Sequence, residues 1–210
     1  MKYNDPDPWH TILAGSKMDK TAITVRDYSV MLKKRDGAGI ARLIRLRFSE
    51  RYLDPALDNP KRNGFAMLAI GCLTVEALES FRNGWKGTRG IVGGCEAAFR
   101  SFFQAYDEFK DLRPVASEFY THVRCGILHQ AETTGNWTVN HSSELFSKSG
   151  ARRRLSASEF GKRLCLVLAR YSDDLAEADW KDPVWKKARK KLRAICRNCG
   201  LPDQDVKRLQ

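Results

Sequence analysis

Helical spacing of apolar residues runs through most of this chain and restricts its fold more than any other feature. Residues 64–84 are apolar along most of their length, and the dipeptide Asn83-Gly84 is typical of a helix end. We therefore predict an all-α fold. The other helices are expected over residues 20–35, 38–53, 95–109 and 156–178, from Pro114 through the segment 118–132, and from Pro183 onward.

Two segments between these helices are expected to be irregular. Residues 87–94, GTRGIVGG, resemble a phosphate-binding loop only in their glycines, because the Lys-Ser/Thr of a Walker loop does not follow. We expect a connector there. Residues 136–141 are predicted to be extended within a polar loop that reaches Arg154, and short strands are compatible with it. His141 in this loop is an additional candidate site residue, with plain solvent exposure as the alternative.

The length and composition suit one well-buried domain, because the chain has 210 residues, 42% hydrophobic content and no Pro/Gly/Ser linker. We predict an N-terminal extension over 1–19, a helical domain over 20–180 and a basic helix and tail over 181–210. The longest apolar run, 65–75, is shorter than the roughly 20 residues of a membrane span. The N-terminal segment lacks the apolar core of a signal peptide. The expected location is cytoplasmic, without membrane contact.

The six cysteines favour a reducing compartment without disulfides, because Cys72, Cys125 and Cys165 lie in apolar helical patterns. Cys196 and Cys199 form a CxxC with no second pair of ligands nearby, so unliganded thiols are expected, with a zinc ion shared between subunits as the alternative. No metal and no cofactor are predicted.

The net charge of +12 is unevenly distributed. Residues 181–199 hold eight Lys or Arg against one Asp, and a second basic cluster follows the polar loop. Such charge favours binding of nucleic acid, with a solvated basic helix as the alternative. Trp180 and Trp185 beside the tail are expected in the core. The predicted nucleic-acid-binding residues are Arg152, Arg153, Arg154, Lys186, Lys187, Arg189, Lys190, Lys191 and Arg193.

The segment 118–132, EFYTHVRCGILHQAE, carries the main candidate site. On a helical wheel its core stripe is formed by Ala116, Phe119, Tyr120, Val123 and Ile127. The opposite side mixes Thr121, Leu128 and Cys125 with Arg124 and His129, which is typical of a cleft or a subunit interface rather than a solvated face. The alternative is a structural arginine that binds a carboxylate, together with a core histidine.

The residues RCGILH, 124–129, match the Arg, four to six residues, then His of the ribonucleases in the HEPN superfamily, which the chain resembles over about residues 20–180. The upstream helix GFAMLAIGCLTVEALESFRNGW and the order of helices are part of this resemblance. Cys125 departs from the pattern, because family nucleases often have a small polar residue directly after the arginine. The resemblance implies a single-domain helical bundle and a two-fold dimer with a shared cleft.

Chemistry supports the roles that the resemblance implies. RNA carries its own nucleophile, the 2′-hydroxyl, so cleavage needs an acid and a base and positive charge on the phosphate. Histidine titrates near neutral pH, and arginine is a permanent cation that can bind two phosphate oxygens. We therefore expect Arg124 and His129 to be catalytic.

Three further residues are supporting candidates. Glu79 is expected to orient Arg124, or else to form an exposed salt bridge. His122 is expected in a hydrogen-bonded row with Glu118 and His129, or else in a surface pair with Glu118. Cys125 is included because it follows the arginine.

Two functions remain open on this basis. The first is a metal-independent, dimeric endoribonuclease that acts as a toxin or effector in bacterial antiviral defence or a toxin-antitoxin pair, with an antitoxin or sensor partner. The second is a non-catalytic HEPN module that binds RNA or a partner protein. A metal nuclease is disfavoured, because no carboxylates and histidines have ligand spacing.

Overall fold

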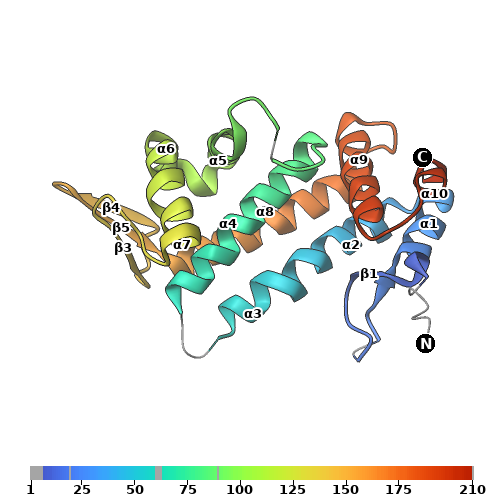
Figure 1. The fold of residues 1–210 in the computed structure, drawn as a ribbon, viewed down its shortest axis with the longest axis horizontal. Helices are drawn as coiled ribbons and strands as arrows, with labels where there is room; N and C mark the ends of the chain where they lie inside the picture. The colour runs from blue at the N-terminus through green and yellow to red at the C-terminus, as the bar shows by residue number, and fades with distance from the viewer. Residues whose placement is uncertain (1–6, 19, 60–62, 89, 210) are drawn as a thin grey trace. The chain divides into compact units, whose positions relative to one another are not determined.

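The computed structural model describes residues 7–18, 20–59, 63–88 and 90–209, and it is mainly helical with two small sheets (Figure 1). The chain forms two compact units. The first unit comprises Met1–Arg51, Phe81–Lys86 and Arg170–Gln210, and the second comprises Tyr52–Ser80 and Gly87–Ala169. In this division the N-terminal segment and the basic tail belong to the same unit. Their apolar residues are buried there, as Leu13 and Val206 illustrate.

The first unit is built on two helices joined by a tight turn, α1 (Val25–Lys34) and α2 (Gly37–Phe48). The other elements are η1 (Pro8–His10), β1 (Ile12–Ala14), β2 (Ile23–Thr24), α9 (Pro183–Asn198) and α10 (Asp203–Arg208). The helix that we expected from residue 20 begins only at Val25, because β2 pairs antiparallel with β1. Thr24 then caps α1 in a capping box, in which Asp27 N donates to Thr24 Oγ1 over 3.2 Å.

Within the first unit, the tail packs on α2 through Trp185, which is 1% exposed and lies against Gly37 at the start of that helix. Its indole Nε1 donates to Ala178 O over 3.3 Å, which satisfies its only donor. The expectation that this tryptophan lies in the core is confirmed. Trp180 is half-buried, with its ring centroid 5.2 Å from that of Trp185.

The second unit contains the candidate motif and two long helices that also extend into the first unit, α4 (Gly64–Asn83) and α8 (Ala157–Glu177). A π-helical turn, η2 (Ser49–Leu53), precedes α3. Three strands form a sheet of order β3 (Trp137–Asn140), β5 (Arg152–Ser156) and β4 (Phe146–Ser149), with β3 parallel and β4 antiparallel to β5. The remaining elements are α3 (Asp54–Leu57), α5 (Gly94–Ala105), η3 (Asp107–Val115), α6 (Ala116–Phe119), η4 (Tyr120–Arg124) and α7 (Cys125–Gln130).

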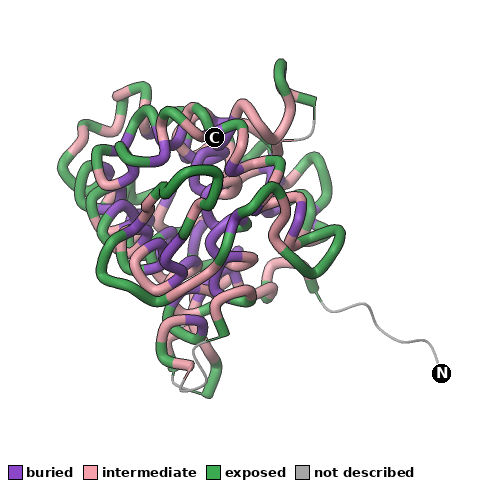
Figure 2. Tube along the Cα trace, turned by 90° about the vertical axis from the view of Figure 1, so that its left-hand side faces the viewer, coloured by how far each residue is buried: buried purple, intermediate pink, exposed green. Residues whose placement is uncertain are grey.

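Packed phenylalanines fix the motif helix in the second unit. Phe119 of α6 is fully buried and lies 5.2 Å from Phe103, 5.4 Å from Phe160 and 5.6 Å from Phe99, measured between ring centroids. Figure 2 shows the buried segments as purple stretches along the chain. Because aromatic pairs add to the free energy of area burial, this cluster holds the start of the motif helix firmly.

By length and composition, helix α4 is apolar enough to cross a membrane. The uninterrupted apolar run 65–75 did not reveal this, because it covers only about half of the helix. However, 56% of its most apolar window is buried inside the protein. Its polar residues are satisfied locally, because Thr74 Oγ1 donates to Ile70 O over 2.9 Å and Ser80 Oγ to Glu76 O over 2.8 Å. This burial is what a core helix requires.

Candidate functional site

The motif helix is not one regular α-helix, because the π-helical turn η4 (Tyr120–Arg124) lies between α6 and α7. Cys125 N donates to Tyr120 O, five residues earlier. Such a turn inserts one residue and shifts every later side chain around the axis, and π turns are frequent at functional sites. Arg124 is the last residue of this turn. Of the predicted core stripe, Ala116, Phe119 and Val123 are buried, whereas Tyr120 and Ile127 are half-buried.

Arg124 is bound to Glu76 on α4. Its Nε donates to Glu76 Oε1 over 2.9 Å, and its Nη2 lies 2.9 Å from the same oxygen. Both side chains are largely enclosed, with 16% and 17% exposed, and the guanidinium carbon lies 5.6 Å from the centroid of the Tyr120 ring. A charge pair so enclosed is screened less than one on the surface. Of the predicted second face of the motif helix, Arg124 and Cys125 are half-buried and Arg124 contacts α4, whereas Thr121, Leu128 and His129 are exposed.

The carboxylate of Glu76 is held at both oxygens. Thr88 Oγ1, in the connector before α5, donates to Glu76 Oε2 over 2.9 Å and also lies 3.3 Å from Cys95 Sγ. Glu76 therefore has little freedom to turn away from Arg124. The predicted connector over 87–94 supplies this contact, which its glycine content did not reveal.

Glu79, the carboxylate that we expected to orient Arg124, is fully buried and accepts a hydrogen bond from Ser101 Oγ on α5. The alternative of an exposed salt bridge for Glu79 is therefore wrong. The carboxylate bound to Arg124 is Glu76, one helical turn earlier on α4. Both glutamates interrupt the same apolar stretch, and only the packing of the helices distinguishes them.

The surroundings of Arg124 favour its charged form. They disfavour the ionised forms of the nearby Tyr120 phenol and Cys72 thiol. Burial disfavours the charged form of Arg124, but the hydrogen bond and charge of Glu76 outweigh it, and its pKa is raised. Burial, and then the hydrogen bond to Cys125, raise the pKa of Tyr120 to about 12. Burial raises the pKa of Cys72 strongly, against the lowering effect of Arg124. The guanidinium thus lies among neutral hydroxyl and thiol groups.

One edge of the Arg124 guanidinium is not used by Glu76. The two contacts to Glu76 Oε1 come from Nε and Nη2, whereas a guanidinium has five N–H donors. The edge formed by Nη1 and the second Nη2 proton has the spacing that matches two oxygens of a phosphate. Glu76 thus holds Arg124 by one edge, the guanidinium also has a hydrogen bond with Cys125, and 16% of the side chain is exposed.

His129 is exposed in the last turn of α7 and makes no hydrogen bond or ion pair within the part of the chain that the structure describes. Five residues of α-helix correspond to a rotation of about 140°. Arg124 and His129 of one chain therefore leave the helix on different sides, one against α4 and one toward solvent.

His122 has a structural environment. Its Nδ1 lies 2.8 Å from Thr134 Oγ1, and its backbone O accepts from Thr134 N over 3.0 Å. Glu118 forms its ion pair with Arg153 of β5, not with His122. The predicted row of Glu118, His122 and His129, and the alternative surface pair, are therefore both wrong. His122 holds the loop that leads from α7 to β3.

Gly126, inside the motif, allows the chain to fold back closely after α7. A Cβ at this position would lie 2.5 Å from Glu132 O, a backbone atom that cannot turn aside. We expect Gly126→Ala to lower the free energy of unfolding by about 1–3 kcal/mol, although alanine is the better helix former. Urea denaturation measures this change. Gly87→Ala is the matched control with open space around it, and an equal loss in both variants would contradict the steric explanation.

The basic cluster on β5 is divided by the alternation of a strand. Arg152 and Arg154 are exposed, whereas Arg153 is half-buried and bound to Glu118. Only the first two remain open to a polyanion. His141, the additional candidate, is exposed and follows β3.

Of the predicted binding residues on α9, three contact other parts of the protein and three are exposed. Arg189 stacks on Trp180, with its guanidinium carbon 4.3 Å from the ring centroid. Lys191 Nζ donates to Lys86 O over 2.9 Å, and Arg193 Nη1 to Leu209 O over 3.4 Å. The exposed members are Lys186, Lys187 and Lys190.

The cysteine pair at the end of α9 does not form a reactive site. Cys196 is buried, and burial followed by the neighbouring Cys199 raises its pKa to about 12. The negative end of the helix dipole adds to this effect. All six cysteines are free thiols, and the described residues contain no group of three or more His, Cys, Asp or Glu that could hold a metal ion.

No protein-family model, curated protein or solved structure matches the chain. The candidate site therefore rests on the geometry around Arg124 and on the chemistry of its residues.

Proposed function

We propose that the protein is a metal-independent endoribonuclease of HEPN type, with Arg124 and His129 as its catalytic residues. The observation that carries the proposal is the enclosed guanidinium of Arg124, which Glu76 holds by one edge. The exposed imidazole of His129 has the chemistry to move protons at the same phosphate.

The reaction would proceed without an external nucleophile. His129 acts as the base or the acid: it takes the proton of a 2′-hydroxyl, or it protonates the departing 5′-oxygen. The 2′-oxygen forms a bond to phosphorus while the bond to the 5′-oxygen breaks, which leaves a 2′,3′-cyclic phosphate and a 5′-hydroxyl. Arg124 would bind two of the equatorial oxygens and stabilise the charge that develops on them.

A homodimer supports this chemistry better than a single chain, because Arg124 and His129 leave the motif helix on different sides. Two copies related by a two-fold axis would bring two motif helices to one cleft. Leu73, 44% exposed, and Leu128, 48% exposed, lie within about one turn of Glu76 and Arg124 respectively. A dimer that placed both leucines at the shared cleft would bury them, which would favour association.

The test is cleavage of labelled single-stranded RNA and tRNA by the purified protein in EDTA. We expect cutting that needs no added metal, 2′,3′-cyclic phosphate ends, and a specific activity that falls when dilution dissociates the dimer. Light scattering gives the mass at each concentration. A monomer that cuts with constant specific activity would contradict the dimeric site, and cutting that EDTA abolishes would contradict the mechanism.

The second candidate function is a non-catalytic HEPN module that binds RNA or a partner protein. Two observations favour it: the charge of Arg124 is already paired with Glu76, and Cys125 stands where family nucleases often have a small polar residue. Salt-sensitive RNA binding without any cutting would support this function in the same assay. The proposed setting for either function is cytoplasmic. A nuclease would act there as a toxin or defence effector controlled by an antitoxin or sensor protein.

A further inference from the structure

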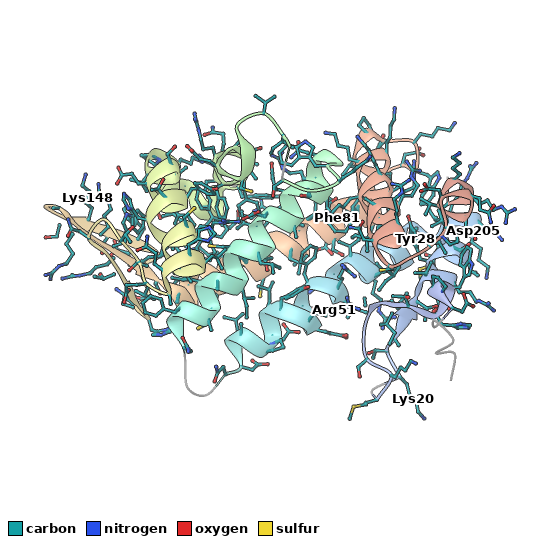
Figure 3. The ribbon with its side chains drawn as sticks, viewed as in Figure 1. Lys20, Tyr28, Arg51, Phe81, Lys148 and Asp205 are labelled. Carbon is teal, nitrogen blue, oxygen red and sulfur yellow. The ribbon has the colours of Figure 1, made fainter. Side chains whose placement is uncertain are left out.

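A basic pocket lies in the first unit, where α9, α10 and Lys86 meet. Its volume is about 240 Å³, and its walls come from three separate stretches of sequence. Figure 1 shows α9 and α10, and Figure 3 marks α10 by Asp205. The lining residues are Lys86, Lys190, Arg193, Ala194, Arg197, Val206 and Lys207.

The pocket carries an excess of positive charge. Five of its seven lining residues are Lys or Arg. The neighbouring carboxylate is Asp203, which accepts from Arg197 Nε over 2.7 Å. This hydrogen bond, then the charges of Arg197, Lys207 and Lys86, lower the pKa of Asp203. Lys86, Lys190 and Lys207 form no salt bridge within the described residues.

The three stretches are tied together before any ligand binds. Lys191 Nζ donates to Lys86 O over 2.9 Å, and Arg193 Nη1 donates to Leu209 O over 3.4 Å. Ala194 and Val206 are buried and are the apolar residues of the lining. Because these contacts already hold the three stretches together, binding of a ligand has to order only the lysine and arginine side chains.

We propose that this pocket binds a phosphate group with more than one negative charge, that is, a terminal phosphate monoester or a diphosphate. Its volume is below the about 300–1,000 Å³ of pockets that enclose a drug-sized ligand, so it suits a phosphate rather than a whole large molecule. Lysine and arginine are the usual phosphate-binding residues. The pocket is one defined site within the basic surface of α9. Binding of a phosphate there does not depend on the proposed nuclease activity.

Binding of inorganic pyrophosphate to the intact protein, measured by calorimetry at moderate salt, tests the pocket directly. We expect saturable binding to one site per chain. Lys86→Gln/Lys207→Gln should weaken it by about tenfold or more, because two charge-assisted contacts are lost. The matched control is Lys186→Gln/Lys187→Gln, which removes the same charge from exposed positions of α9 outside the pocket and should change affinity little.

A third variant removes a negative charge beside the pocket instead of a positive charge within it. Asp203→Asn should bind pyrophosphate more tightly, because the carboxylate no longer competes for Arg197. Absence of saturable binding, or an equal loss in both double variants, would overturn the proposal. None of these measurements involves cutting of RNA, so they are independent of the nuclease assay.

The source of the phosphate is distinguished by competition against pyrophosphate. Oligoribonucleotides that differ only in a 5′-phosphate or a 5′-hydroxyl are compared on the His129→Ala protein, so that cleavage does not interfere. Competition by the 5′-phosphorylated strand alone would support an RNA end as the ligand. Competition by a nucleoside diphosphate, with neither strand competing, would support a free phosphorylated molecule. Failure of all three to compete would count against the proposal.

Discussion

Replacing His129 by alanine is expected to slow RNA cleavage by about 10²- to 10⁴-fold, which is the contribution of a positioned acid or base. The side chain is exposed and makes no bond within the described residues, so the free energy of unfolding should stay within about 0.5 kcal/mol of the original. RNA affinity should also be retained. Single-turnover rates in EDTA, urea denaturation and filter binding measure the three quantities.

His10→Ala is the control for this variant, because His10 is likewise exposed, with 63% of its side chain accessible, but belongs to the first unit. It should cut RNA at the original rate. Equal cutting by the His129 variant would show that the chemistry lies elsewhere. Loss of RNA affinity in parallel with the rate would instead assign His129 to binding, as the non-catalytic alternative requires.

The helices of this chain could be predicted closely because their signals are local. Asn83-Gly84 ends α4 where expected, and α8 follows Ser156, whose Oγ accepts from Glu159 N over 3.3 Å. Residues 20–24 were assigned wrongly to a helix because Ile23 and Thr24 pair with β1, and strand pairing depends on residues distant in sequence. The extended piece near residue 137 was confirmed as β3. Its parallel pairing with β5 is a contact of the same non-local kind.

The half-buried position of Arg124 was predictable from the sequence, but its contacts were not. Spacing placed Arg124 on a half-buried face, whereas the carboxylate partner was expected at Glu79 and lies at Glu76. A regular wheel cannot show the extra residue of η4, which turns Arg124 relative to Tyr120. Net charge likewise could not show that Arg153 and Arg189 are engaged within the protein, because both contacts depend on tertiary packing.

The basic tail illustrates the same limit. The sequence analysis separated 181–210, as a basic helix and tail, from the helical domain over 20–180. In the structure Trp185, Leu192 and Val206 are buried in the first unit, so truncation of 181–210 is expected to unfold that unit. Point substitutions of exposed lysines therefore test nucleic-acid binding, whereas truncation does not.

The ion pair of Arg124 separates a structural role from a catalytic one. Arg124→Met should lower the free energy of unfolding by about 2–4 kcal/mol, because it leaves the largely enclosed carboxylate of Glu76 without a partner. The double variant Glu76→Gln/Arg124→Met should recover most of this loss. Glutamine removes the unpaired charge, and its amide oxygen can still accept from Thr88 Oγ1.

Cleavage should not recover with stability. Both variants lack the cation at the phosphate, so we expect each to cut about 10²- to 10³-fold more slowly than the original protein, the usual effect of removing one group that stabilises transition-state charge. Arg42→Met, at an exposed position of α2, controls for the loss of one positive charge. Urea denaturation and single-turnover cleavage of each variant supply both readouts. A double variant that is stable and cuts normally would mean that Arg124 serves only the fold, because its charge would then be unnecessary at the phosphate.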